Sequence, residues 1–96
     1  MKFEWDEEKN RINKRKHRVS FEEAETVFED KYAVYDYDKS HSSDEDWFIV
    51  IGVSDEFDRE LTVCHCYRGP NDEIIRIISA RRATKNEIKL YEEGLP

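Results

Sequence analysis

The 96-residue sequence has no long apolar run, and it contains only two cysteines. No stretch approaches the roughly 20 apolar residues that a membrane-spanning helix needs, and the charged amino terminus differs from a signal peptide. We therefore expect a cytoplasmic protein without a membrane partner. Cys64 and Cys66 are separated by one residue of a predicted strand, a spacing that suits neither a mutual disulfide nor a four-ligand zinc site. We expect no metal and no cofactor.

Apolar residues make up only 38% of the chain, whereas charged residues make up 41%. A chain of this length is near the lower limit for a single hydrophobic core. Five phenylalanines, five tyrosines and two tryptophans nevertheless supply enough bulky side chains to form one. No internal repeat or linker divides the sequence, so we expect one domain spanning residues 1–96.

The net charge of −7 is unfavourable for nucleic-acid binding, because nonspecific affinity comes mainly from neutralised phosphates. The distribution of charge matters more than its total, however. The segment from Lys9 to Arg18 contains six basic residues and no acid. A second basic group consists of Arg68, Arg76, Arg81, Arg82 and Lys85. Two basic patches on an acidic protein leave nucleic-acid binding open.

Hydrophobic spacing and turn signals predict an α+β fold with three helices and four strands. Two helices are expected in the amino-terminal third and one at the carboxyl end, after N-cap residues Asp6, Ser20 and Thr84. The expected helices cover 7–16, 21–30 and 85–93, and the expected strands cover 32–38, 47–53, 59–68 and 73–80. Short turns between the strands favour an antiparallel sheet. The first helix has Ile12 as its only aliphatic residue, so we expect few contacts to hold it.

Four motifs, in this order along the chain, resemble the BrnT family of bacterial toxins. They are Phe3-Glu-Trp-Asp-Glu-Glu-Lys9, Asn13-Lys-Arg-Lys-His17, Val19-Ser-Phe-Glu-Glu-Ala24, and Arg76 to Ala83 followed by Glu87 and Tyr91. The resemblance covers nearly the whole chain. It implies a RelE-like fold and a small ribonuclease, which a BrnA-type antitoxin holds inactive. It also implies a two-plus-two complex with that antitoxin, an RNA substrate, and contact with DNA only through the antitoxin.

Cleavage of RNA without a metal needs a base, a cation beside the phosphate and an acid. Arg68, Arg76 and Arg81 are the candidates for the cation, because a guanidinium group is always charged and can hold two oxygens. For Arg76 the alternative is a salt bridge to an acid such as Glu87. The candidates for proton transfer are His65, with a buried core role as its alternative, and His17, with a structural role as its alternative. His41 lies in a polar loop and is not expected to take part.

Lys14, Lys16, Arg82 and Tyr91 are the candidates for RNA binding outside the catalytic centre. Tyr91 could stack on a base, or it could pack the last helix onto the core. The acids of the second helix, Glu22, Glu23, Glu25 and Glu29, form either a solvated face or a contact with the antitoxin.

One departure from the family pattern supports a second hypothesis. Members often carry an acid-x-Arg element where the second strand begins, whereas this chain has Glu45-Asp-Trp47. The chain could therefore have lost catalysis and serve as a binding module in an antitoxin complex that represses its own operon.

Overall fold

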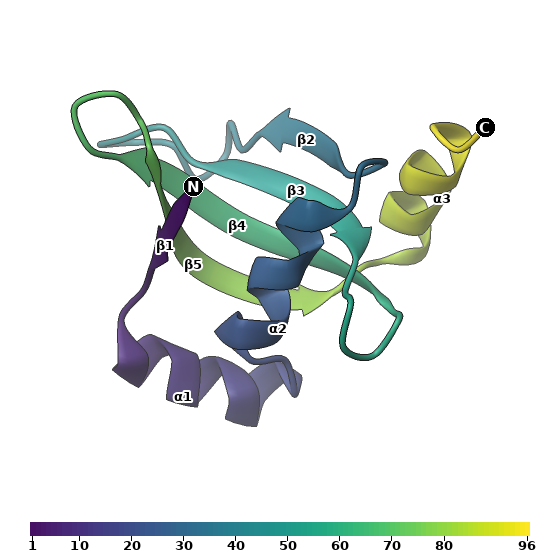
Figure 1. The fold of residues 1–96 in the computed structure, drawn as a ribbon, viewed down its shortest axis with the longest axis horizontal. Coiled ribbons are helices and arrows are strands. Elements are labelled where there is room, and N and C mark those ends of the chain that lie inside the picture. The colour runs from purple at the N-terminus through teal and green to yellow at the C-terminus, as the bar shows by residue number, and fades with distance from the viewer.

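The computed structural model describes all of residues 1–96. It contains five strands, three α-helices and one 3-10 turn, η1 (Figure 1). The strands are β1 (Lys2–Glu4), β2 (Val34–Tyr37), β3 (Phe48–Val53), β4 (Glu60–Arg68) and β5 (Ile74–Arg82). The helical segments are α1 (Glu7–His17), α2 (Phe21–Thr26), η1 (Val27–Glu29) and α3 (Lys85–Glu93). None of the helices is long and apolar enough to cross a membrane.

The strands form one mixed sheet in the order β1-β5-β4-β3-β2. The α+β class and the three helices agree with the sequence prediction, but the expectation of a four-stranded antiparallel sheet was wrong. The additional strand is β1, which pairs in parallel with β5 and sets Phe3 opposite Ile75. Three residues are too few for an alternating pattern to be recognised. Their partner strand also lies at the far end of the sequence, so no hairpin signal links them.

The sheet has two different faces, because successive side chains of a strand point in opposite directions. Leu61, Val63 and His65 of β4 point to the face that packs under α2, which we call the core face. Thr62, Cys64, Cys66 and Arg68 therefore point to the opposite face, as the alternation in the sequence predicts. The register of β4 with β5 shifts between Cys64 and His65, which leaves Ile78 as an extra residue.

The hydrophobic core lies between the core face and the segment from Val19 to Val27. Val19, Phe21, Ala24 and Val27 pack against Val50, Leu61, Val63, Ile77 and Ala80. In Figure 1, α2 crosses in front of the sheet. The β4–β5 turn lies at one end of the strands, and α3 lies at the opposite end. Gly52 of β3 permits the close approach of η1, because a Cβ atom there would lie 2.9 Å from Val27 Cγ1.

Helix α1 docks through asparagines rather than through Ile12. Ile12 is 40% exposed, whereas Asn10 and Asn13 are the buried residues of this helix. Asn13 donates to the carbonyls of Val19 at 2.9 Å and Ala80 at 2.8 Å, and it accepts from the Ala80 N–H. Asn13 thereby forms hydrogen bonds with the backbone N–H and C=O of Ala80, which lies beyond the part of β5 that pairs with β1.

The Asn13→Ala variant should be about 2–3 kcal/mol less stable than the wild type. The substitution leaves the buried N–H and C=O of Ala80 without partners, and each unsatisfied group costs about 1–3 kcal/mol. Urea denaturation followed by circular dichroism measures the difference. The neighbouring Ile12→Ala is the control and should change stability by less than about 0.5 kcal/mol. A larger loss in Ile12→Ala than in Asn13→Ala would contradict this description of the interface.

The helix ends follow the sequence signals closely. Asp6 and Ser20 accept hydrogen bonds from the first turns of α1 and α2, and Thr84 forms a complete capping box with Glu87. Helix α2 is shorter than predicted, because η1 replaces its last turn. Arg18 ends α1 in the left-handed region with φ 59°, a conformation that glycine would adopt without strain. Strand β5 continues past its predicted end at Ala80 through Arg82.

Candidate functional site

The three candidate arginines share the sheet face opposite to the core face, which we call the arginine face. In the β4–β5 register, Arg68 is opposite Ile74, Arg76 is opposite Cys66, and Arg81 is opposite Thr62. Arg76 and Arg81 are five residues apart on one strand, so their Cα atoms lie about 15 Å from each other. The arginines therefore form a line along the strands rather than a ring around one phosphate.

Each of these arginines forms an ion pair within the chain. Arg68 Nη1 lies 2.9 Å from Glu45 Oε2, Arg76 Nη1 lies 2.8 Å from Glu4 Oε2, and Arg81 Nη1 lies 2.7 Å from Glu87 Oε1. The partner of Arg76 is thus Glu4 rather than Glu87, because β1 brings Glu4 beside it. Every guanidinium group has five N–H donors, so each pair leaves donors free for a further acceptor.

The ion pair of Arg81 is held by more hydrogen bonds than the other two. Glu87 accepts from Nη1 and Nη2 of Arg81 and also from Thr62 Oγ1 and the Thr84 N–H. The hydrogen bonds from Arg81 lower the pKa of Glu87 to about 2, against an opposing effect of burial. Glu87 thus fixes the direction of the Arg81 guanidinium at the point where β5 turns into α3.

A cavity of about 160 Å³ lies at the Arg81 end of the arginine face. Its wall combines Thr62, Cys64, Ser79 and Arg81 from the sheet with Asp38, His41, Trp47 and Ile49 from the β2–β3 connection and the start of β3. The connection folds back over the sheet, because Ser42 Oγ donates to the carbonyls of Asp38 and Trp47 and accepts from the Trp47 N–H. A permanent cation and a histidine therefore line one cavity.

His41 is held by Asp38 in this cavity. His41 Nδ1 lies 3.0 Å from Asp38 Oδ2 and 3.1 Å from Ser40 Oγ, whereas Nε2 makes no hydrogen bond within the chain. A carboxylate at Nδ1 favours the tautomer with the proton on Nδ1, which leaves the Nε2 lone pair free to accept a proton. The prediction had set this histidine aside as part of a polar loop. The sequence signal that could have identified His41 is the Asp38-x-x-His41 spacing.

His65 lies on the core face and has no exposed surface. Its Nδ1 is 3.3 Å from the Val63 carbonyl and its Nε2 is 3.3 Å from Tyr67 Oη. Burial lowers the pKa of His65 to about 4. The sheet separates His65 from the arginines, so its position favours the alternative role over proton transfer beside them. The alternative role as a hydrogen-bonded core histidine agrees with the structure.

The stability of the wild type should fall as the pH decreases from about 6.5 to about 4. The folded state keeps His65 neutral in this range, whereas the unfolded chain binds the proton at an ordinary pKa of 6.5. Protonation therefore favours unfolding, and the free energy of unfolding falls by up to about 1.4 kcal/mol for each pH unit. Urea denaturation at a series of pH values measures it. His65→Gln should lose this part of the slope, and an unchanged slope would contradict the burial of a neutral imidazole.

The other predicted residues do not gather on the arginine face. Helix α1 lies along the edge of β5, and no hydrogen bond or ion pair joins Lys14, Lys16 or His17 to the arginines. Arg82 points away from Arg81, since it is opposite Leu61 in the register. Tyr91 is only 5% exposed and donates to Asp30 Oδ2 at 2.6 Å. This burial favours the alternative given for Tyr91, the packing of α3 onto the core, over stacking on an RNA base.

The two thiols of β4 are poor nucleophiles and poor metal ligands. Burial raises the pKa of Cys64 to about 12, and it also raises the pKa of Cys66. Metal coordination by cysteine requires the thiolate form. No group of three or more His, Cys, Asp or Glu side chains in the chain is arranged to hold a metal ion.

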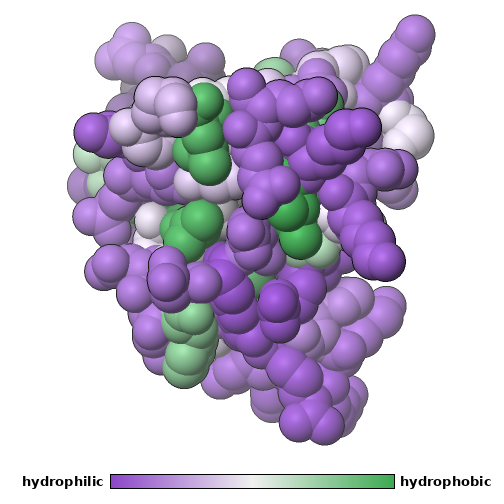
Figure 2. Space-filling view, turned by 90° about the vertical axis from the view of Figure 1, so that its right-hand side faces the viewer, coloured by the Kyte–Doolittle hydropathy of each residue, from purple (hydrophilic) through white to green (hydrophobic).

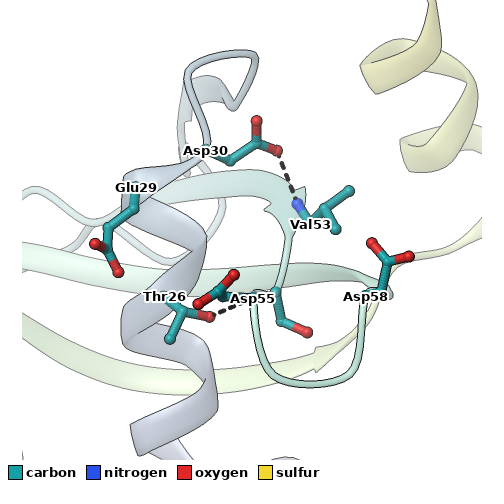
Figure 3. Close-up of a pocket in the computed structure, with 7 residues that line it drawn as sticks. Thr26, Glu29, Asp30, Val53, Asp55 and Asp58 are labelled. Atoms are coloured by element: carbon teal, nitrogen blue, oxygen red, sulfur yellow. Dashed lines mark hydrogen bonds between the residues drawn. The ribbon is translucent and has the colours of Figure 1, made fainter.

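A second hollow, of about 360 Å³, is acidic and lies on the side of η1 (Figure 3). Glu29, Asp30, Asp55 and Asp58 contribute carboxylates to it, and Asp30 and Thr26 accept backbone hydrogen bonds from Val53 and Asp55. Carboxylates repel phosphate groups, so this hollow does not suit RNA. The cavity beside Arg81 is the better candidate.

No curated protein matches the chain significantly. Residues 5–87 match the family of the ribonuclease toxin BrnT of type II toxin–antitoxin systems. The match includes all four strands of the antiparallel part of the sheet, His41 and the three arginines. This chain therefore belongs to the BrnT family of ribonuclease toxins.

Proposed function

We propose that this chain is a metal-independent endoribonuclease that inhibits growth by cleaving RNA in the cavity beside Arg81. The observation that carries the proposal is the meeting of Arg81 with the His41–Asp38 pair around one solvent-accessible cavity. A fixed cation and an oriented imidazole are two of the groups that metal-free phosphodiester cleavage needs.

In the proposed reaction, Nε2 of His41 takes the proton from a ribose 2′-hydroxyl. The 2′-oxygen attacks the adjacent phosphorus and displaces the 5′-oxygen, which receives a proton from solvent water. Arg81 stabilises the additional negative charge on the phosphorane through its free N–H groups, while Glu87 keeps the guanidinium in place. The products are a 2′,3′-cyclic phosphate and a free 5′-hydroxyl end.

Arg76 and Arg68 would bind phosphates further along the same RNA strand. Their spacing along the sheet supports contacts with successive phosphates better than contacts with one. Arg68 is 43% exposed and its partner Glu45 is 38% exposed, so an RNA phosphate can replace that carboxylate at little cost. Lys14 and Lys16 would add contacts with the RNA backbone beside the edge of β5.

We infer that the neutralising partner is a BrnA-type antitoxin and that two toxins and two antitoxins form the complex. Family membership supports an antitoxin partner in general. In this proposal, DNA is bound only through the antitoxin, and the toxin acts on RNA in the cytoplasm.

Replacement of Arg81 by alanine tests the proposed site. We expect RNA cleavage to fall by about 100- to 1,000-fold, which is typical for the loss of one donor that stabilises the transition state. The matched control is Arg82→Ala, which removes the same charge one position away, from the opposite face. Cleavage of a defined RNA in the presence of EDTA measures both variants. Equal losses in the two variants, or loss of wild-type activity in EDTA, would contradict the proposal.

The ion pairs favour a second candidate function, a binding module without catalysis. All three arginines already have carboxylate partners, as expected of residues that only stabilise the fold. The Glu87→Gln variant separates the two functions, because it removes the charge that holds the Arg81 guanidinium in place. Under the nuclease proposal the wild type cleaves RNA and the variant cleaves it more slowly, whereas under the second candidate neither protein cleaves RNA.

A further inference from the structure

The nuclease proposal leaves the aromatic side chains of the core face unused. A groove of about 650 Å³ lies on this face, and six of its lining residues are hydrophobic. These six are Met1, Phe3, Phe28, Tyr35, Tyr67 and Ile75. We call it the aromatic groove. Its lining residues come from the amino terminus and β1, from α2 and η1, and from β2, β4 and β5.

The floor of the aromatic groove is a cluster of rings around His65. The buried His65 ring lies 4.9 Å from the Phe28 ring, 5.3 Å from the Tyr67 ring and 6.2 Å from the Tyr35 ring, measured between centroids and in edge-to-face orientations. Tyr35 nevertheless remains 50% exposed, and the neighbouring Tyr37 is 45% exposed. Exposed tyrosine rings are enriched in protein–protein contacts that contribute much of the binding energy.

The end of the molecule that carries α3 and the acidic hollow are both less apolar than the aromatic groove. The end of the molecule that carries α3 is mostly hydrophilic, with small separate hydrophobic patches (Figure 2). The acidic hollow has only one hydrophobic lining residue. An apolar groove on a chain with 41% charged residues therefore calls for an occupant.

The charge at the rim selects the kind of occupant. Glu25 and Glu29 line the groove one helical turn apart, neither forms an ion pair, and α2 carries no basic residue. Two unpaired carboxylates repel RNA phosphates. A second copy of the chain fits no better, because in a two-fold dimer both copies bring the same acidic rim to the interface and α2 offers no basic residue to pair with it. The groove is thus complementary to a protein segment with apolar side chains and adjacent Lys or Arg residues.

We propose that the aromatic groove anchors the antitoxin through an amphipathic segment that buries apolar side chains against Tyr35, Phe28 and Tyr67 and pairs basic side chains with Glu25 and Glu29. The proposal rests on the toxin–antitoxin function. The groove and the arginine face are on opposite sides of the sheet. Occupation of the groove therefore leaves the arginine face open, and a different segment of the antitoxin blocks cleavage.

The test measures antitoxin affinity and RNA cleavage separately. The probe is the purified antitoxin, defined as the product of the adjacent gene that forms a complex with this chain. In the double variant Glu25→Lys/Glu29→Lys, we expect the Kd for the antitoxin to rise about 100-fold, because basic side chains then meet like charge. Cleavage by the free variant should stay at the wild-type level, and saturating antitoxin should still inhibit it completely. Tyr35→Ala should also raise the Kd, by at least about tenfold.

The matched control is Glu92→Lys/Glu93→Lys, which makes the same change of charge at the end of α3, outside the groove. Its Kd should remain within about threefold of the wild type, since exposed charges distant from a contact contribute little. The proposal is overturned if antitoxin binding is weakened equally in both double variants, or if it is weakened in neither. Reduced RNA binding in the groove variants also overturns it, in favour of an RNA contact. If the wild type cleaves no RNA but the groove variants still lose the antitoxin, the nuclease proposal fails and the groove stands.

Discussion

Replacement of His41 by asparagine is expected to lower the rate of RNA cleavage by about 100- to 10,000-fold, the range typical for the loss of a general base. Asparagine keeps a polar side chain of similar reach, but it cannot take the proton from a 2′-hydroxyl. Binding of an RNA that cannot be cut should change by less than about threefold, because the phosphate contacts of the arginines remain. Single-turnover cleavage and a binding titration measure the two quantities.

The same substitution at His17 is the matched control. His17 is the last residue of α1 and makes no contact with Arg81 or His41. His17→Asn should therefore cleave RNA at the wild-type rate. Asp38→Asn should give a smaller loss than His41→Asn, because it disturbs the orientation of the imidazole and leaves the imidazole itself in place. A rate that falls in His17→Asn but not in His41→Asn would assign proton transfer to the basic helix instead.

Replacement of Arg59 by alanine is expected to destabilise the protein by about 3–5 kcal/mol, as is typical when one partner of a buried ion pair is removed. Arg59 donates to Glu23 Oε2 at 2.8 Å and to Glu23 Oε1 at 2.6 Å, and Glu23 is 1% exposed. Burial would raise the pKa of Glu23, but hydrogen bonds from Arg59 and Ser54 outweigh it and lower the pKa. Without Arg59 the buried carboxylate keeps only Ser54 as a side-chain donor.

Urea denaturation measures this loss, and a surface ion pair provides the control. Arg11 pairs with Glu8 on α1, where the two side chains are 57% and 62% exposed. Arg11→Ala should leave the stability close to that of the wild type, because solvent screens such pairs. Similar losses in the two variants would mean that the Glu23–Arg59 pair is not buried in solution.

The sequence predicts the elements of this fold better than their partners. Capping residues Asp6, Ser20 and Thr84 mark helix starts by local hydrogen bonds, so local sequence suffices to find them. The pairing of Glu4 with Arg76 joins positions 72 residues apart, and nothing local encodes it. The same holds for Glu23, for which the charge pattern predicted either a solvated face or a contact with the antitoxin. Its burial depends on Arg59, 36 positions away.

Some residues of the candidate site also follow from local sequence patterns, whereas others depend on the tertiary fold. The shared face of Arg68 and Arg76 follows from strand alternation across a hairpin whose turn is recognisable at Gly69-Pro70. Arg81 joins that face only because β5 extends beyond Ala80 and a bulge at Ile78 shifts its alternation. His41 reaches the cavity through the fold of the β2–β3 connection, which no periodic pattern describes. For that reason the sequence analysis did not select His41 and considered the strand residue His65 for proton transfer instead.

The most direct test of the account is the position of bound RNA on the protein. An RNA with methylated 2′-hydroxyl groups cannot be cut, and its titration against the 15N-labelled chain can be followed by the amide shifts of each residue. The account predicts that the shifts concentrate at Thr62, Cys64, Ser79, Arg81 and His41. Shifts concentrated instead at Phe3, Tyr35 and Tyr67, on the opposite side of the sheet, would contradict it.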